Sequence, residues 1–241
     1  MDSLRIAPSP TYAREMIGAR ILEHAAQIGG EIEILEAGCG RNWNIDLGGI
    51  SYRITGIDVD AEALRYREEI VNDLDVAIVG DLRTVDFQKG SFDVVFSAFV
   101  LEHISGAAQV LDRMVDALKP GGLLILRTPD GKSVYAFLAR LLPFWTHVLY
   151  KRIADHDKLA GKPGHPPYRV VYDDIVAREG FRNYFDRSGL TLIEEVGTNP
   201  HLYNIGRLAP IGWAAQRTIA WLSRGRLSGT HSNLTLVAMK R

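Results

Sequence analysis

The sequence contains a single cysteine, Cys39, among its 241 residues. One cysteine cannot form a disulfide bond within the chain, and it cannot supply the several thiolates of a cysteine-based zinc site. We interpret Cys39 as a small residue tolerated in a turn; the alternative is a redox or nucleophilic role. A fold that is cross-linked by internal disulfide bonds, or held by a zinc ion bound to several cysteines, is therefore excluded.

Long apolar runs are also missing. No stretch approaches the roughly 20 consecutive apolar residues that a membrane-spanning helix requires. The first five residues, Met-Asp-Ser-Leu-Arg, do not begin a signal peptide, so we predict a cytoplasmic protein. Hydrophobic residues make up 46% of the chain and charged residues 24%, which is enough apolar material for one buried core.

Acidic residues are absent from 196–241, where six basic residues occur, although the whole chain has a formal net charge of −1. These basic residues are spread out and lack the stacking aromatic residues of a strand-binding groove, so we predict no nucleic-acid partner. A surface for something anionic is the alternative interpretation of this stretch.

In the first half of the chain, apolar runs typical of strands alternate with amphipathic segments typical of helices. This alternation predicts a parallel sheet with helices on both faces. Apolar runs predict strands near 32–36, 53–57, 76–79, 92–97 and 122–127, and amphipathic periodicity predicts helices near 11–27, 60–71 and 106–118. The link 40–52 is short and polar, so a helix there is reduced to a turn or two. After an irregular segment at 131–169, we expect a helix near 172–188 and strands at 190–196 and 233–239.

The most informative stretch is 34–42, Ile-Leu-Glu-Ala-Gly-Cys-Gly-Arg-Asn, an apolar run that opens into a turn with Gly38 and Gly40. Glycines let the backbone approach a ligand closely, because no Cβ stands in the way and positive φ is accessible. The alternative is an ordinary tight connection between a strand and a helix.

Acidic residues follow the predicted strands. Asp58 and Asp60 close the second apolar run, and Asp81 closes the third. Carboxylates at strand ends contribute nothing to a core, whereas an acid beside the first loop of a parallel sheet can accept both hydroxyls of a ribose. We prefer Asp58 to Asp60 for that role, and we predict a nucleoside site.

From Glu33 to Pro129 the chain resembles the class I S-adenosylmethionine-dependent methyltransferases, in the small-molecule, type 11-like branch. The resemblance rests on the glycine turn, Gly-Ile-Asp at 56–58, Gly-Asp-Leu at 80–82, Ser-Phe-Asp-Val-Val at 91–95, Leu-Glu-His at 101–103 and Leu-Lys-Pro-Gly-Gly at 118–122. Each piece is common, but their joint occurrence in this order is specific. The chain departs from the family at Asn42, where a third glycine is frequent; asparagine tolerates left-handed backbone, so we expect retained binding.

The resemblance implies S-adenosylmethionine as the cofactor and assigns its contacts. Gly38 and Gly40, with Cys39 between them, would face the methionine part, and Glu36 its amino-acid end. Asp58, followed by Val59, would hold the ribose, Asp81 with Leu82 the adenine, and Ser97 would face the sulfonium.

The family also implies a fold: a doubly wound α/β domain with a mostly parallel seven-stranded sheet, an antiparallel last strand and a helical insertion after strand five. We predict one methyltransferase domain over 1–241. It has an N-terminal helix in 1–30, a cofactor-binding core in 31–130, and lid or substrate-side segments in 131–170 and 200–230.

Large apolar residues gather at 134–150, including Phe144 and Trp145, in a segment broken by Pro143. Three interpretations stay open: a helix pair that covers the sheet, a lid over an apolar acceptor pocket, or a contact with a membrane surface. A second amphipathic stretch at 210–224 carries Trp213 and Trp221; it either packs on its own domain or meets anionic lipid.

Methyl transfer to a hydroxyl needs a base, and the weak candidates are His103, His165 and Tyr168. His103 belongs to the Leu-Glu-His pattern, which favours a structural or pocket-forming role over a substrate-specific one. Some quinone-pathway relatives hold a metal through two glutamates and a histidine around this pattern. Phe99 replaces the first of those glutamates here, so we predict no metal.

Together these features predict S-adenosylmethionine-dependent methyl transfer, to oxygen rather than carbon or nitrogen, on a small or medium, partly apolar metabolite or a lipid-linked acceptor. We expect a monomer or weak dimer, with weak peripheral membrane contact as a further option. One alternative is a catalytically silent domain that binds the cofactor or its product. A dinucleotide-dependent oxidoreductase is the less favoured one.

Overall fold

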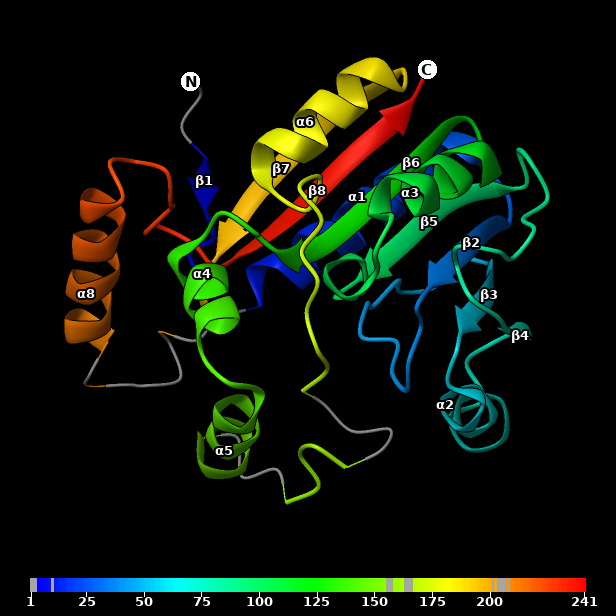
Figure 1. Ribbon diagram of the computed structural model, residues 1–241. Helices are drawn as coiled ribbons and strands as arrows, with labels where there is room; N and C mark the ends of the chain where they lie inside the picture. Colours follow the sequence, from blue (N-terminus) through cyan, green and yellow to red (C-terminus); the bar gives the residue numbers. More distant parts are fainter. Residues whose placement is uncertain are drawn as a thin grey trace.

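The computed structural model describes residues 4–9, 11–154, 158–162, 167–200, 202, 207 and 209–241. Its centre is one eight-stranded sheet with the order β1-β7-β8-β6-β5-β2-β3-β4 (Figure 1). The strands are β1 Arg5–Ile6, β2 Ile32–Ala37, β3 Tyr52–Asp58, β4 Val76–Val79, β5 Phe92–Ala98, β6 Leu118–Pro129, β7 Leu190–Thr198 and β8 Asn233–Lys240. β8 runs antiparallel to β6 and β7, and the other pairs are parallel. The expected α/β fold with an antiparallel last strand is confirmed.

The strand count of seven is too low by one. Arg5–Ile6 forms an additional edge strand, β1, which pairs in parallel with Val196 and Gly197 of β7. An ion pair between Arg5 and Glu194, 3.6 Å long, lies at this edge. Two residues are too short a run to show the period-2 pattern of a strand, so β1 could not be predicted from the sequence.

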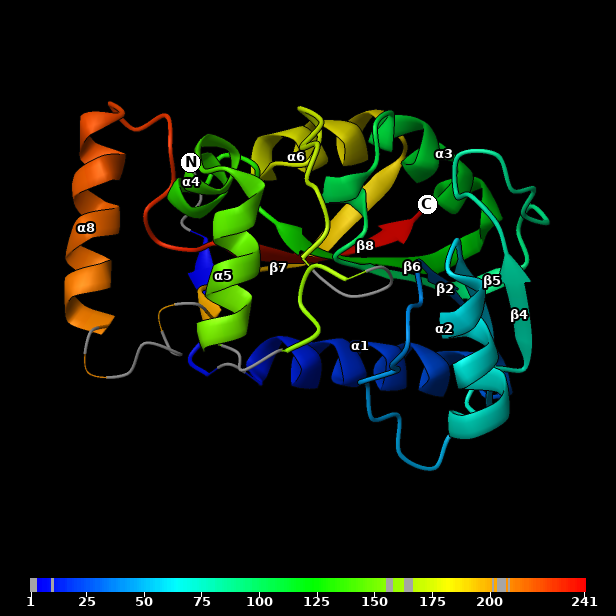
Figure 2. The ribbon, with the colours of Figure 1, turned by 60° about the horizontal axis from the view of Figure 1, so that its bottom comes forward.

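Helices cover both faces of the sheet. They are α1 Tyr12–Ile28, α2 Ala61–Tyr66 with the π-helical turn η1 Arg67–Val71, the 3-10 turn η2 Leu101–His103, α3 Ala107–Ala117, α4 Val134–Leu141, α5 Phe144–Ala154, α6 Arg178–Arg187 and α8 Ala209–Leu222. α1 lies along one face, and α3 and α6 lie along the other (Figure 2). The sheet is therefore buried on both sides, as parallel sheets are.

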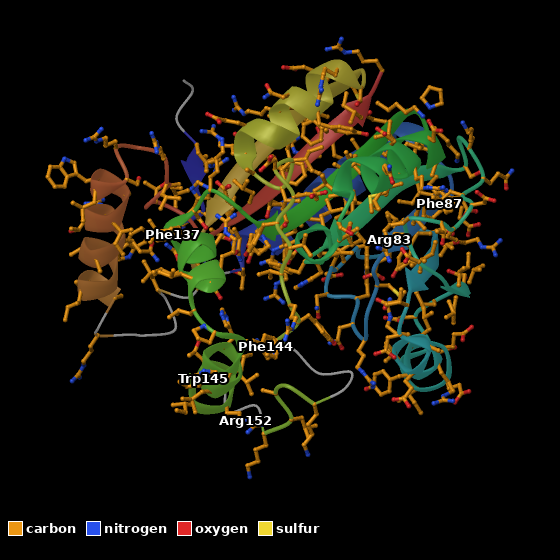
Figure 3. The ribbon with its side chains drawn as sticks, in the orientation of Figure 1. Arg83, Phe87, Phe137, Phe144, Trp145 and Arg152 are labelled. Carbon is orange, nitrogen blue, oxygen red and sulfur yellow. The ribbon has the colours of Figure 1, made fainter. Side chains whose placement is uncertain are left out.

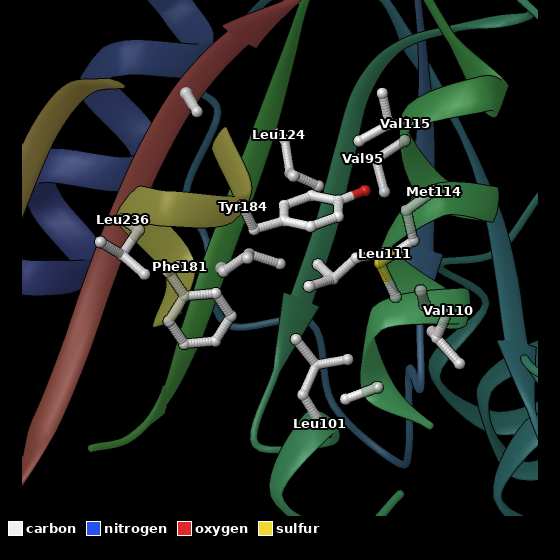
Figure 4. Packing of buried hydrophobic residues seen from close by; sticks show 14 of the residues in the cluster. Val95, Leu101, Val110, Leu111, Met114, Val115, Leu124, Phe181, Tyr184 and Leu236 are labelled. Atoms are coloured by element: carbon white, nitrogen blue, oxygen red, sulfur yellow. The ribbon is translucent and has the colours of Figure 1, made fainter. Parts of the chain in front are cut away.

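Each face has its own hydrophobic core. On the α1 face, Ile17 and Ile21 pack with Ile34 of the sheet. On the other face, Met114 of α3 and Phe181 of α6 belong to the cluster that Figure 4 shows. The link between β2 and β3 contains no helix, where a helix of a turn or two was expected, and it closes the α1-side core with Ile45 and Leu47.

The helix expected over 172–188 begins only at Arg178. Residues 172–177 do not join it because their polar groups are used elsewhere. The Tyr172 N–H donates to the Glu102 carbonyl, and the Asp173 carboxylate accepts from the N–H groups of Gly106 and Ala107 at the start of α3. A helix cap supplied from 66 residues away leaves no local pattern in the sequence.

The segment after β6 folds as two helices, α4 and α5, separated at Pro143. α4 starts with a Ser133 cap, whose Oγ accepts from the Ala136 N–H, and buries Val134 and Ala136. α4, α5 and α8 gather at one end of the molecule in both views. The helical insertion after the fifth strand of the core is thus present.

Candidate functional site

The candidate site lies at the carboxyl ends of β2, β3 and β5. In the sheet order, β2 lies between β3 and β5. The chain continues from β2 to β3 on one side, and β5 joins the other side of β2 later in the sequence. Such a switch point opens a crevice at the carboxyl edge, and ligands of open α/β sheets bind there. The glycine turn that follows β2 lies at this carboxyl edge.

Gly38 and Gly40 serve different purposes in this turn. Gly38 has φ 74°, and a Cβ there would lie 2.2 Å from Cγ2 of Val100, so only glycine fits. Gly40 has φ 54° and no atom within 4 Å of a Cβ position. The backbone at Gly40 therefore borders open space in which a ligand can lie against it.

Asp58 is fixed beside that open space. Its Oδ2 accepts from the Gly40 N–H at 2.8 Å and its Oδ1 from the Asp60 N–H at 2.9 Å. Each carboxylate oxygen keeps a further lone pair that can accept from a hydroxyl. Asp60 instead caps α2 through Oδ1, which supports the preference for Asp58. Val59 is 71% exposed and offers an apolar surface next to Asp58.

Asp81 and Leu82 follow β4. The Arg83 guanidinium donates to both oxygens of Asp81, and these hydrogen bonds lower the pKa of that carboxyl to about 2. Asp81 is therefore a permanent carboxylate that already has a partner. Leu82 is buried in the core, so its predicted contact with the adenine stays a prediction.

Ser97 and Glu36 both point into the protein. The Ser97 hydroxyl donates to the Ala37 carbonyl at 2.9 Å and ties β5 to the end of β2. The Glu36 Oε2 accepts from Nη1 of Arg67 at 2.7 Å, and both side chains are buried. Their predicted contacts with the cofactor stay predictions; the geometry assigns them to the support of the turn.

Arg67 is a functional residue that the sequence reasoning missed. Its Nε donates to Asp73 at 2.7 Å, and its Nη1 also donates to the Cys39 carbonyl at 3.1 Å, inside the glycine turn. Burial raises the pKa of Glu36 to about 7, although the nearby Arg67 guanidinium acts to lower it. The sequence did contain a signal for this residue, because Arg67 lies on the same helical face as the buried Ala63 and Leu64. A charged side chain on a buried face needs polar partners.

Cys39 is buried within the same turn. Burial raises the pKa of its thiol to about 12, with the negative charge of Glu36 as a further cause. A thiol with so high a pKa stays protonated at neutral pH and is a poor nucleophile. The interpretation of Cys39 as a small turn residue agrees with this environment.

On the acceptor side, a strap formed by residues 167–172 crosses η2. The N–H groups of Val171 and Tyr172 donate to the Glu102 carbonyl, and the Arg169 carbonyl lies 2.7 Å from Nδ1 of His103. A carbonyl can only accept, so Nδ1 carries the proton and Nε2 of the neutral ring has a free lone pair. Burial lowers the pKa of His103, which keeps the ring neutral at pH 7.

Tyr168 connects the two halves of the site. Its ring meets the His103 ring edge-on at a centroid distance of 5.9 Å. Burial raises the pKa of its hydroxyl, and the charges of Asp60 and Asp58 raise it further, which places Tyr168 near the ribose-side acids. His165, the third candidate base, lies outside the described residues.

Glu102 is buried beneath His103. Thr128 donates to its Oε2 at 3.2 Å, and burial raises its pKa to about 7. Its Oε1 is 3.8 Å from Nε2 of His103. Among the residues that the structure describes, no group of three His, Cys, Asp or Glu could hold a metal ion.

Arg127, at the end of β6, is a second residue that the sequence reasoning missed. Its Nε is buried without a hydrogen-bond partner, and its guanidinium lies 5.1 Å from the Phe99 ring centroid. Phe99 has φ 58°, a strained value for an aromatic residue. Burial and then the charge of Arg14 lower the pKa of Arg127. No carboxylate of the described chain pairs with Arg127, so this cation is available to an anionic ligand.

The segment 134–150 is only partly directed to the site. Phe144 contacts the strap through Arg169, whose guanidinium carbon lies 5.6 Å from its ring centroid. Trp145 is 65% exposed, and Figure 3 shows both residues on α5, at the far side of the molecule from Arg83. The lid interpretation is thus supported for Phe144 more than for Trp145.

The donors and the open space fit an adenosine-bearing ligand. Gly40 leaves room for close approach, Asp58 has lone pairs for two hydroxyls, and Val59 gives a ring a flat apolar neighbour. All three lie at the carboxyl ends of the neighbouring strands β2 and β3, at one edge of the sheet.

Part of the chain is similar to known methyltransferases. Residues 35–126 match the family Methyltransf_11, described as a methyltransferase domain. A probable S-adenosylmethionine-dependent methyltransferase of Mycolicibacterium smegmatis is 30% identical over 99 residues, 41% of this chain and 38% of that protein. This chain therefore spans well under half the length of that relative.

Two further proteins match over more of the chain. The malonyl-[acyl-carrier protein] O-methyltransferase of Erwinia billingiae is 22% identical over 191 residues, 79% of this chain and 73% of that one. The crystal structure of a putative S-adenosylmethionine-dependent methyltransferase from Listeria monocytogenes superposes with a TM-score of 0.58 at 14% identity and covers 94% of this chain and 98% of its own. Residues 35–126 are thus similar to a methyltransferase domain, and the chain shares the fold of solved S-adenosylmethionine-dependent methyltransferases.

Proposed function

We propose that this chain transfers the methyl group of S-adenosylmethionine to an oxygen atom of a small or medium-sized, partly apolar acceptor, either a metabolite or a lipid-linked molecule. The observation that carries the proposal is the pose of His103. Its Nδ1–H donates to the Arg169 carbonyl, so Nε2, which lies 3.8 Å from Oε1 of Glu102, is left as a proton acceptor. A neutral imidazole so oriented is what an O-methyltransferase needs from a base.

Asp58, Gly40 and the backbone after β4 would hold the cofactor. When bound, S-adenosylmethionine supplies an electrophilic methyl group on a cationic sulfur. The protein then has to align the acceptor with that carbon and exclude water, because displacement at carbon is an in-line reaction. Tyr168 and the strap 167–172 lie over this edge and are suited to both tasks.

His103 would take the proton of the acceptor hydroxyl. As the hydroxyl oxygen forms its bond to the methyl carbon, its proton moves to Nε2, and the bonding electrons leave with sulfur. The ring becomes an imidazolium whose Nδ1–H remains on the Arg169 carbonyl. Because burial lowers the pKa of His103, this imidazolium readily releases the proton afterwards.

The acceptor side supports an acceptor with apolar and anionic parts. Phe144 and Phe99 offer aromatic surface, and Arg127 offers a guanidinium without an acidic partner. The Erwinia relative is an O-methyltransferase of a malonyl group on a carrier protein, which supports an oxygen acceptor in this branch. We propose that the chain acts without a metal and as a monomer or weak dimer.

The test is a transfer assay with S-adenosylmethionine labelled in its methyl group. Hydroxyl- and carboxyl-bearing acceptors are compared with amines and with matched acceptors whose oxygen is already methylated. We expect label only in the free-oxygen acceptors, and labelled methanol after alkaline hydrolysis if the product is an ester. Label in amines or at carbon would contradict oxygen methylation. Cofactor binding without transfer to any acceptor would favour a catalytically silent binding domain.

A further inference from the structure

α4, α5 and α8 together expose a set of large apolar side chains that we call the apolar flank. Its members are between 47% and 77% exposed: Leu141, Leu142, Trp145, Leu149, Ile153, Ile211, Trp221 and Leu222. α8 buries none of its described residues, although it is 14 residues long and packs beside α4. The three helices lie together at one end of the molecule (Figures 1 and 2). A monomeric domain rarely exposes so many large apolar side chains in one place without a partner.

The helices of the apolar flank carry no acidic residue. Arg217 lies on α8, Arg224 follows the helix, and both are exposed. Lys151 and Arg152 lie in the last turn of α5, and Asp155 and Asp157 follow that helix in the sequence. Every formal charge on α4, α5 and α8 themselves is therefore positive.

This charge pattern decides between the occupants that an apolar surface can have. A second copy of the chain would bring cations against cations, which costs free energy at a contact. An anionic lipid surface attracts each of them. At 1.5 Å per residue, α8 is about 21 Å long, shorter than the roughly 30 Å hydrocarbon core, so it suits an orientation in the plane of the interface.

The C-terminal end of α8 has a feature that fits lipid in particular. An open hollow there is lined by Trp221, Leu222 and Arg224, away from the glycine turn. An indole, an aliphatic side chain and a guanidinium in one hollow match the boundary between acyl chains and phosphates. In the described chain no helix is long and apolar enough to cross a membrane.

We propose that the apolar flank docks this protein on an anionic lipid bilayer, with α8 lying in the plane of the interface and its arginines on the phosphate groups. Phe144 at the start of α5 touches Arg169 of the strap, so docking brings the acceptor side of the site close to the lipid. Only this last consequence rests on the proposed function. Membrane binding itself needs neither cofactor nor turnover.

The test is sedimentation with large vesicles of phosphatidylcholine alone, or of phosphatidylcholine and phosphatidylglycerol in equal parts. We expect the protein to sediment with the anionic vesicles and to be released at about 0.5 M salt, where charges are screened beyond a few ångströms. The double variant Trp221→Ala/Leu222→Ala should lower partitioning by on the order of tenfold or more. Arg217→Gln and Arg224→Gln should each lower it about fivefold on anionic vesicles and leave phosphatidylcholine unaffected.

Ile70→Ala is the matched control. Ile70 is 68% exposed, but it lies on η1, away from the apolar flank. The control and the flank variants should keep the melting temperature of the unaltered protein, because the replaced side chains are exposed. Equal sedimentation of the unaltered protein and the Trp221/Leu222 variant would overturn the proposal. So would a dimer in sedimentation velocity that the same variant converts to monomer, since the flank would then be an interface between copies.

Discussion

Replacing Arg67 by methionine should show that the glycine turn depends on a buried charge network. Methionine fills similar space, so the change removes charge and hydrogen bonds with little cavity. Arg67 is fully buried, and its loss leaves the Glu36 carboxylate buried without its cation. Breaking a buried pair in this way costs about 3–5 kcal/mol. A domain with a typical stability of about 5–15 kcal/mol would remain folded but clearly weakened.

Urea denaturation followed by circular dichroism measures that loss, and titration with S-adenosylhomocysteine measures the effect on the turn through the Cys39 carbonyl. Arg65→Met is the matched control, because Arg65 is an exposed arginine of the same helix and should change stability by less than about 0.5 kcal/mol. Adding Glu36→Gln to Arg67→Met should recover about 2–3 kcal/mol, since a neutral amide tolerates burial better. A loss below about 1 kcal/mol for Arg67→Met, or strictly additive effects in the double variant, would refute the reasoning.

Five further substitutions test the two sides of the site. Asp58→Ala should weaken the binding of S-adenosylhomocysteine by about 1.5–3 kcal/mol in calorimetry. Asp81→Ala should weaken it less, because the Asp81 carboxylate is already bound by Arg83. Equal affinities of the unaltered protein and both variants would show that neither acid contacts the ligand. His103→Gln should lower kcat at least about a hundredfold while the affinity for S-adenosylhomocysteine holds, and wild-type kcat should fall only below pH 6.5, because the pKa of His103 is lowered. An unchanged kcat would exclude His103 as the base. Burial raises the pKa of Glu102 to about 7, so the free energy of unfolding falls as pH rises from about 4.5 to 7. The Glu102→Gln variant should lack up to about 3 kcal/mol of this fall, measured by urea titrations at pH 5 and pH 8. Parallel pH dependence in both proteins would contradict this. Arg127→Met should raise KM for anionic acceptors at least about tenfold and leave cofactor affinity unchanged, and a KM that rises equally for neutral acceptors would assign Arg127 to packing.

The core of the fold could be read from the sequence because its signals are local. Buried parallel strands such as Ile32–Ala37 are continuous apolar runs, and each glycine or acid that ends them marks the carboxyl edge. The short, polar link after Gly40 predicted a helix of at most a turn or two, and the structure has none there.

The parts that were missed depend on contacts between distant residues. The two-residue strand β1 exists only through its pairing with β7, and the strap 167–172 is held by hydrogen bonds to Glu102, 69 residues earlier in the case of Val171. Arg67 can be buried because Glu36 and Asp73, 31 and 6 residues away in the sequence, accept hydrogen bonds from it. Tertiary partners, rather than propensity, decide such positions.

The exposure of α8 is a further case in which the sequence left two interpretations open. Its apolar positions share one helical face, as in any helix that packs on its own domain. The structure shows Ile211, Trp221 and Leu222 exposed, which that interpretation does not explain. Periodicity reveals that a face is apolar, but it cannot reveal what covers that face.

The central claim is that the crevice beside Gly40 and Asp58 binds a sulfur nucleoside, and isothermal titration calorimetry of the unaltered protein tests it most directly. S-adenosylmethionine and S-adenosylhomocysteine should each bind with one site per chain at micromolar level, on the order of −8 kcal/mol, and NAD should give no heat of binding. Tight binding of NAD with no response to either sulfur nucleoside would contradict the account.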